Sequence, residues 1–294
     1  MKSVLFPEIC YKFIGLTLQS VTNALNGDYA ITCVPKYVDQ KRKEVVVKLG
    51  EGLWGYLPYE EVTIYRMFKI YSVSKNIPVQ IIDILEKNIR AKILRIEDGR
   101  IILSRKANML EAFEYLKTCS LVRIHVTRMS WTKLYGDIGD GIVGSMDIRE
   151  ICNSKISNVK EQFRVGDILW VKVQSVQDKL TFFLSYKERF PKYDPSDYEV
   201  GSLISCIVTV PLNDPITGYY AIVTPQVRGI VNTKENTPYL RYGSKITAKI
   251  IGKNEQGLKL VFVRFPPSQK KYAEQEGDIS KKEETEEDQE AQNE

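Results

Sequence analysis

Two serines in a repeated phrase are the residues that most suggest catalysis. The chain reads IILSRK at 101–106 and FFLSYK at 182–187, so Ser104 and Ser185 hold equivalent positions. A serine nucleophile needs an activating base, and in one large hydrolase class it stands in a Gly-x-Ser-x-Gly turn. Neither serine stands in such a turn, and the chain has one histidine for two sites. We therefore expect a structural role, in which the preceding leucines fill a core and the serines satisfy backbone groups.

Metal and thiol chemistry have no better basis in the sequence. The five cysteines are Cys10, Cys33, Cys119, Cys152 and Cys206. None pairs as Cys-x-x-Cys and the histidine, His125, has no second histidine beside it, so neither a zinc site nor a histidine-based triad can be built. Clustered carboxylates for two-metal chemistry are not seen either. We expect no metal, no cofactor and no enzymatic activity, and we place His125 on the surface or at a strand edge.

Composition indicates a protein with packed cores and no membrane partner. The chain has 294 residues, of which 43% are hydrophobic, but no apolar run approaches the roughly 18–20 residues of a membrane helix. Pro7 and Glu8 interrupt the first apolar run too early for a signal peptide. An odd number of unpaired cysteines suits reduced thiols. We expect a cytoplasmic protein.

Charge divides unevenly along the chain. Residues 265–294 contain four Lys and ten Asp or Glu, and this −6 leaves +11 on residues 1–264 from the formal net charge of +5. The tail has almost no large apolar residues and is expected to be disordered. A basic body with an acidic tail indicates a polyanion as partner. Excess lysine that merely keeps the protein soluble is the alternative.

Three stretches repeat the same order of signals, which makes them related modules. Each has an apolar strand-like run, and a glycine stands nine residues after one position of that run. The pairs are Val46 and Gly55, Tyr135 and Gly144, and Tyr220 and Gly229. About five short β-branched or aromatic runs fall in each module, separated by Gly, Asp, Asn and Pro. Small closed antiparallel barrels, of which the OB-fold is one, have this content.

We therefore predict an all-β fold: a tandem array of three small five-stranded barrels, with a short connecting helix and a disordered acidic tail. That these barrels are OB-folds is what the resemblance described below implies. The expected boundaries are a lead segment at 1–26, module 1 at 27–106, the connecting helix at 107–117, module 2 at 118–190, a divergent module 3 at 197–265 and the tail at 266–294. The helix follows from KANMLEAFEYLKTC, whose apolar residues recur at helical spacing. SVTNALNG predicts a second short helix that ends at Gly27.

Module 2 resembles the S1-type RNA-binding domain, an OB-fold module named for the ribosomal protein in which it recurs. The resemblance rests on VRIHVTRMSWTKLYGDIGDGIVG, on the loop NSKISNVKEQFRVGD, on the strand FRVGDILWVKVQSV and on the closing phrase LSYK. Module 1 shares LSRK, whereas module 3 closes with LKLVFV and has lost Leu-Ser. The layout over roughly 22–265 is similar to short, three-module ribosomal S1-like proteins of clostridial bacteria.

The resemblance implies that single-stranded RNA lies on the outer face of strands two and three. Bases stack on aromatic rings there, and Lys or Arg contact phosphates. It places the strand-two aromatic at Tyr135 in module 2 and at Tyr220 in module 3, whereas module 1 has Val46. The side-chain period of two puts Trp54 and Tyr56 on one face of strand three. They face outward if Leu57 points into the core.

Further contacts follow from the same resemblance. Trp131, just before Tyr135, is expected to stack beside that ring or to cap the barrel end. Arg100, Arg105 and Lys179 are expected to contact phosphates. A histidine often found on strand three is replaced by Pro58, Asp147 and Asn232. The segment 62–78 is longer than a barrel loop needs, and we expect it either to contact RNA or to cover the barrel.

The sequence as a whole favours a non-catalytic protein that binds single-stranded RNA, such as mRNA. The partners that this reading implies are the RNA itself and either the small ribosomal subunit or an RNA-processing protein. We expect the role to be linked to translation or to the small ribosomal subunit. One alternative is an accessory RNA-binding protein of an RNA-degradation machine. A second is an OB-fold adaptor that binds proteins.

Overall fold

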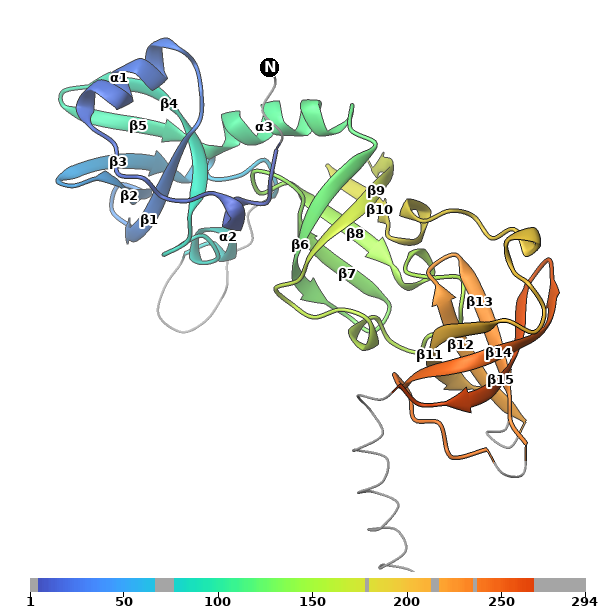
Figure 1. Cartoon of the computed structure of the whole chain (residues 1–294). Coiled ribbons are helices and arrows are strands. Elements are labelled where there is room, and N and C mark those ends of the chain that lie inside the picture. Colours follow the sequence, from blue (N-terminus) through green and yellow to red (C-terminus); the bar gives the residue numbers. More distant parts are fainter. Residues whose placement is uncertain (1–4, 67–76, 178–179, 213–216, 235–236, 267–294) are drawn as a thin grey trace, which may run out of the picture. The chain divides into compact units, whose positions relative to one another are not determined.

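The computed structural model describes residues 5–66, 77–177, 180–212, 217–234 and 237–266 (Figure 1). The chain divides into two compact units, one of residues 1–150 with 162–189 and one of residues 151–161 with 190–294. The expected tail from residue 267 onward and residues 67–76 of the long segment lie outside the described residues. No helix in the described part is long and apolar enough to cross a membrane.

Each of the three modules folds into a closed five-stranded barrel, which confirms the predicted all-β fold. Barrel 1 consists of β1 (Ile31–Asp39), β2 (Glu44–Gly50), β3 (Leu53–Pro58), β4 (Ile89–Glu97) and β5 (Arg100–Ser104). Barrel 2 consists of β6 (Leu121–Met129), β7 (Lys133–Asp137), β8 (Val143–Asp147), β9 (Ile168–Gln177) and β10 (Thr181–Ser185). Barrel 3 consists of β11 (Leu203–Pro211), β12 (Gly218–Thr224), β13 (Val227–Asn232), β14 (Lys245–Asn254) and β15 (Gly257–Arg264).

The barrels share one topology. Around barrel 1 the strand order is β1-β2-β3-β5-β4, and barrels 2 and 3 repeat it. In every barrel the third and fifth strands pair in parallel, while the other pairs are antiparallel. The first, second, third and fifth strands therefore lie side by side, and their outward side chains form one continuous face.

In the part of the chain that the structure describes, three α-helices accompany barrel 1. Helix α1 (Leu18–Asn26) begins after Thr17, whose hydroxyl accepts from Ser20 N, and ends at Gly27 as expected. Helix α2 (Val79–Ile82) precedes β4. Helix α3 (Arg105–Leu116) is the expected connecting helix and starts two residues before residue 107. Short 3-10 turns lie at Glu8–Cys10, Tyr59–Glu61, Ile148–Glu150, Val159–Glu161, Lys187–Arg189 and Pro195–Asp197.

The repeated serines are helix caps, which explains both the early start of α3 and the repetition of the phrase. Ala107 N donates to Ser104 Oγ at 2.8 Å, and Ser104 Oγ donates to Glu61. In barrel 2, Glu188 N donates to Ser185 Oγ at 3.2 Å. Both serines are fully buried. A serine that accepts from the N–H three residues later satisfies a donor that the helix start leaves free, so the structural role predicted for these serines is confirmed.

The repeated glycines have an equally local cause. A Cβ on Gly55 would lie 2.9 Å from Leu103 Cδ1, and a Cβ on Gly144 would lie 2.5 Å from Leu184 Cδ1. In barrel 3 a Cβ on Gly229 would lie 2.6 Å from Leu260 Cδ1. Each closing-strand leucine is at most 1% exposed and fills its barrel. Glycine on strand three therefore makes room for the leucine of strand five.

Candidate functional site

Three strand-two residues, each nine positions before one of these glycines, occupy the same place in their barrels. Val46 pairs with Tyr56, Tyr135 with Ser145, and Tyr220 with Ile230, in each case with the residue directly after the glycine. The row then continues onto the fifth strand, at Ile102, Phe183 and Lys259 respectively. We call the outward side chains of this row, with their immediate neighbours, the platform of each barrel.

The platform of barrel 2 carries two half-buried aromatic rings and a cation. Tyr135 on β7 and Phe183 on β10 both pair with Ser145, so they flank one small side chain. Arg128 on β6 is exposed and places its guanidinium carbon 4.6 Å from the Tyr135 ring centroid. Because Leu134, Phe182 and Leu184 point into the core, their strand neighbours must face outward. Aromatic faces beside a positive charge result.

The platform of barrel 1 has its aromatic residues on other strands. Leu57 is fully buried, which confirms that Trp54 and Tyr56 face outward, and Trp54 is 40% exposed. Tyr37 on β1 is 56% exposed, and its ring centroid lies 6.4 Å from that of Trp54. Tyr56 stands opposite Val46. Val46 on strand two is not aromatic, but the residue beside it on strand three, Tyr56, is.

Arg100 on β5 contacts both the Tyr56 ring of this platform and the carboxylate of Glu44. Its guanidinium carbon lies 4.1 Å from the Tyr56 ring centroid, and its Nη2 donates to both carboxylate oxygens of Glu44 at 2.6 and 2.7 Å. The Glu44 side chain is 10% exposed and that of Arg100 is 34% exposed. In this structure Arg100 thus orients the Tyr56 ring, and its charge is partly neutralised by Glu44.

The platform of barrel 3 has one aromatic ring. Tyr220 is half-buried on β12, and Lys259 on β15 is exposed in the same row. Lys155 places its Nζ 5.8 Å from the Tyr220 ring centroid. Lys155 belongs to segment 151–161, which the expected boundaries assigned to module 2. The structure puts this segment in the second unit, where Asn153 bonds to Pro225 O and to Gln226.

The remaining expected residues lie elsewhere. Trp131 is 70% exposed in the turn between β6 and β7. Its expected role, to stack beside Tyr135 or to cap the barrel end, stays a prediction. Lys179 lies outside the described residues. Arg105 is 6% exposed, with its Nε and Nη2 bonded to the two carboxylate oxygens of Glu8 at 2.9 and 2.7 Å. We correct the expectation that Arg105 contacts phosphate, because its guanidinium is enclosed by an ion pair.

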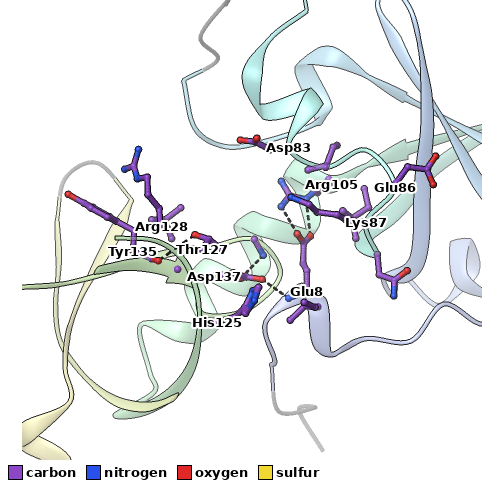
Figure 2. Close-up of a pocket in the computed structure, with 17 residues that line it drawn as sticks. Glu8, Asp83, Glu86, Lys87, Arg105, His125, Thr127, Arg128, Tyr135 and Asp137 are labelled. Carbon is purple, nitrogen blue, oxygen red and sulfur yellow. Dashed lines mark hydrogen bonds and ion pairs between the residues drawn. The ribbon is translucent and has the colours of Figure 1, made fainter. Parts of the chain in front are cut away.

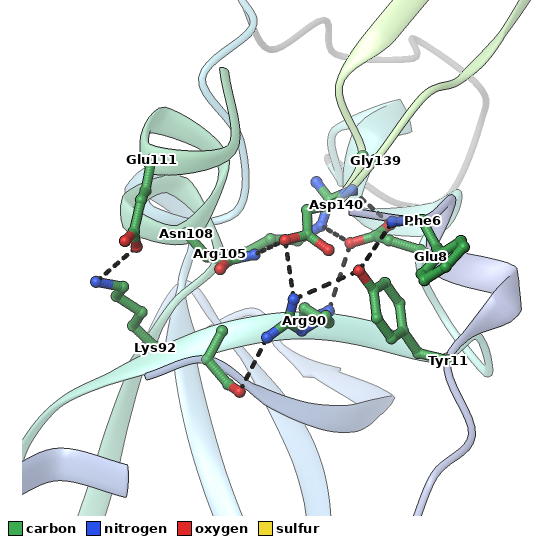
Figure 3. Close-up of polar contacts among 12 residues, drawn as sticks. Phe6, Glu8, Tyr11, Arg90, Lys92, Arg105, Asn108, Glu111, Gly139 and Asp140 are labelled. Carbon is green, nitrogen blue, oxygen red and sulfur yellow. Dashed lines mark hydrogen bonds and ion pairs between the residues drawn. The ribbon is translucent and has the colours of Figure 1, made fainter. Parts of the chain in front are cut away.

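Arg105 belongs to a polar network inside the first unit (Figure 3). The N-terminal segment, α3 and the β7–β8 connection meet there; this connection is residues 137–143, from the last residue of β7 to the first of β8. Asn108 Nδ2 and Arg90 Nη1 donate to Asp140 Oδ2 at 3.0 and 3.3 Å, and Asp140 is 1% exposed. The N–H groups of Glu8, Gly139 and Gly141 donate to Asp137. Burial, followed by the charge of Glu8, raises the pKa of Asp137 to about 7.

A cavity of about 830 Å³ opens next to this network, still within the first unit (Figure 2). One wall is formed by His125, Thr127, Arg128 and Tyr135 of barrel 2. The opposite wall comes from the turn between α2 and β4 and from the first residue of β4, with Asp83, Ile84, Glu86, Lys87, Asn88 and Ile89. His125, expected on the surface or at a strand edge, is half-buried in the first wall. Burial, followed by the charge of Lys87, lowers its pKa.

Sequence reasoning missed several of these side chains. Phe183 could have been found, because Phe182 and Leu184 alternate with it in FFLS and one set must face outward. Tyr37 and Arg128 depend on the register of their hairpins, which contain β-bulges. The position of Lys155 depends on a packing contact of a loop. No local pattern in the sequence encodes such a contact.

No protein-family model matches the chain, and no curated protein matches it either. Among solved structures, it is similar to a multidomain protein with nucleic acid binding domains from Streptococcus pneumoniae TIGR4, at 15% identity and a TM-score of 0.25, covering 80% of this chain and 73% of that one. Drosophila Unr CSD456 is 11% identical, with a TM-score of 0.19 and coverage of 81% and 97%. Yeast Ssd1, a pseudonuclease, is 12% identical, with a TM-score of 0.18 and coverage of 90% and 25%. The fold assignment rests on the strand pairing of the chain itself.

Proposed function

We propose that this protein binds single-stranded RNA on the platforms of its barrels and performs no catalysis itself. The observation that carries the proposal is that one register row in every barrel holds an outward-facing aromatic ring with a cation beside it. Stacking on such rings tolerates any base, and cations along the row suit a phosphate backbone. The +11 charge of residues 1–264 provides long-range attraction for a polyanion.

The platforms favour a single strand over a duplex. Bases in an A-form helix are stacked on one another and present only their edges, whereas the bases of a single strand can lie flat on a ring. A row such as Tyr135, Ser145 and Phe183 offers two ring faces separated by one strand. We propose mRNA as the ligand, translation at the small ribosomal subunit as the setting and the cytoplasm as the location. None of the five described cysteines forms a disulfide, which suits that compartment.

The test is fluorescence anisotropy with labelled poly(U), poly(A) and duplex RNA across a salt series. We expect the single strands to bind more tightly than the duplex, with affinity that falls as salt rises. Tyr135→Ala with Phe183→Ala should weaken binding by about 1–3 kcal/mol for each stacked base lost, which is roughly 5-fold to 150-fold per base.

Trp170→Ala is the matched control, because Trp170 is a 38% exposed aromatic residue on β9 of the same barrel outside the platform row. The corresponding changes for the other barrels are Trp54→Ala and Tyr220→Ala. If RNA binds equally well to the platform variants and to the control, the platforms are not the site. If no single strand binds at all, the proposed function is wrong and a protein partner should be sought.

A further inference from the structure

The cavity of the first unit continues directly from the platform of barrel 2. Tyr135 and Arg128 belong to both, since they line the cavity and form the ring–cation pair of the platform (Figure 2). Binding sites for small molecules typically have volumes of about 300–1,000 Å³, and this cavity falls in that range with about 830 Å³. A strand that lies on Tyr135 therefore has an opening of suitable size beside it.

The cavity has cations that no carboxylate neutralises. Among the described residues, neither Lys87 nor Arg128 forms an ion pair. Two of the four lining carboxylates form ion pairs: Glu8 pairs with Arg105, and Glu86 pairs with Lys36. Of the other two, Asp137 is half-buried and accepts from three backbone N–H groups, whereas Asp83 is exposed at the end of α2 and has no cation partner among the described residues. Two available cations against one exposed carboxylate favour a ligand with negative charge.

Uncharged polar groups lie between these cations. Thr127 is exposed on β6, and its Oγ1 donates only a long bond of 3.4 Å to Tyr135 O. His125 is half-buried two residues earlier on the same outward side of β6. The lowered pKa of His125 leaves its imidazole mostly neutral at pH 7, with one donor and one acceptor. Such groups can pair with the edge of a base, which a purely cationic surface cannot do.

We propose that this cavity binds the nucleotide adjacent to the one stacked on Tyr135, with its phosphates between Lys87 and Arg128 and its base against His125 and Thr127. The inference rests on the proposed function and extends it, because it gives the strand a path from the platform of barrel 2 toward barrel 1. The first unit then binds RNA as one continuous site.

The single histidine allows a direct test by NMR on the full-length protein. The chain has one histidine, so its imidazole gives one set of signals without assignment by mutation. Oligo(U) strands of about 4 to about 16 nucleotides, the range of OB-fold site sizes, are added in turn. We expect the His125 signals to shift with the same dissociation constant as anisotropy reports. We also expect bound RNA to raise the pKa of His125, because a nearby phosphate favours the imidazolium.

The matched variants are Lys87→Ala and Lys117→Ala. Lys117 follows α3, does not line the cavity, and removes the same charge when replaced. Lys87→Ala should weaken the binding of the longer strands about 3-fold to 10-fold and lower the slope of log affinity against log salt by about 0.7, the value for one phosphate contact on a single strand. Lys117→Ala should leave the slope unchanged.

The outcomes separate this inference from the proposed function. If RNA binds and depends on Tyr135 and Phe183, but the His125 signals stay in place and Lys87→Ala behaves like Lys117→Ala, the cavity inference is overturned and the platform function stands. If RNA does not bind, or binds without dependence on the platform residues, the proposed function fails first. A His125 shift that Lys87→Ala reduces and Lys117→Ala does not supports the cavity as part of the RNA path.

Discussion

At the scale of single residues, the aromatic content of a platform is not tied to one strand. Barrels 2 and 3 have a tyrosine on strand two, at Tyr135 and Tyr220, whereas barrel 1 has Val46 there and Tyr56 directly across from it. The register pairs these two positions, so either can present a ring to the same outer surface. Barrel 1 therefore has an aromatic ring in this row, even though Val46 replaces the strand-two tyrosine.

The first prediction concerns the cap of α3. Ser104→Ala removes an acceptor for Ala107 N and a donor to Glu61. We expect the free energy of unfolding to fall by about 1 kcal/mol, the usual cost of losing an N-cap, as measured by urea denaturation. RNA affinity at a temperature well below unfolding should not change. Ser175→Ala, at an exposed position on β9, should alter stability by less than about 0.5 kcal/mol. Equal effects of the two changes would contradict the capping role.

At the scale of elements, one loop joins the parts of the first unit. The β7–β8 connection, residues 137–143, carries Asp137 at the end of β7 and Asp140 in the loop, which accept bonds from the N-terminal segment, from β4 and from α3. A buried ion pair between Arg105 and Glu8 completes the contact. Breaking such a pair from one side commonly costs about 3–5 kcal/mol because the other charge stays buried. The loop is thus a structural joint as well as the edge of the cavity.

The second prediction follows from the pKa of Asp137, which burial and then Glu8 raise to about 7. A carboxyl whose pKa rises on folding contributes stability that is fully present below its unfolded pKa, near 4, and is lost as the pH rises toward 7. The free energy of unfolding should therefore fall over this range, by at most roughly 4 kcal/mol from this group. Denaturant unfolding at several pH values measures the change.

Asp137→Asn should flatten that pH dependence, since the amide does not titrate. Asp98→Asn is the control, because Asp98 is an exposed carboxylate in the turn between β4 and β5. If wild type, Asp137→Asn and Asp98→Asn all show the same dependence between about pH 4 and about pH 7, the titration of Asp137 does not govern this contact.

At the scale of the whole molecule, the chain combines three platforms with an uneven distribution of charge. Linked sites that bind one strand raise each other's effective concentration, so weak single platforms can give tight overall binding to a long strand. In the proposed function the basic body attracts RNA, whereas residues 267–294 carry all of the tail's −6. The tail's charge should therefore oppose binding through electrostatics alone.

The third prediction is that deletion of residues 267–294 raises RNA affinity a few-fold at low salt. The gain should vanish near 1 M salt, where the screening length is only about 3 Å. A second variant keeps the length but replaces the ten acidic residues with their amides. It should bind RNA more tightly as well. Tighter binding after deletion but not after amide replacement would assign the effect to chain length instead of charge.

The sequence alone determined the three barrels and their shared register. Side-chain alternation and turn glycines depend on neighbours in the chain, and the count of nine residues back from Gly55, Gly144 and Gly229 identified equivalent positions without a structure. The structural role of the serines was also local, because a cap acts over three residues. The outward direction of Trp54 and Tyr56 followed from the same alternation.

Only the tertiary structure decided which charges are available. Arg100 and Arg105 look alike in the sequence. In the structure, however, Arg100 pairs with Glu44 beside the platform of barrel 1, whereas Arg105 is enclosed by Glu8, nearly a hundred residues away along the chain. The cavity and the contact between Lys155 and Tyr220 likewise join residues distant in sequence. Burial and ion pairing depend on three-dimensional packing, and no periodicity along the chain records them. The fold could thus be predicted from the sequence, but the charges of the site could not.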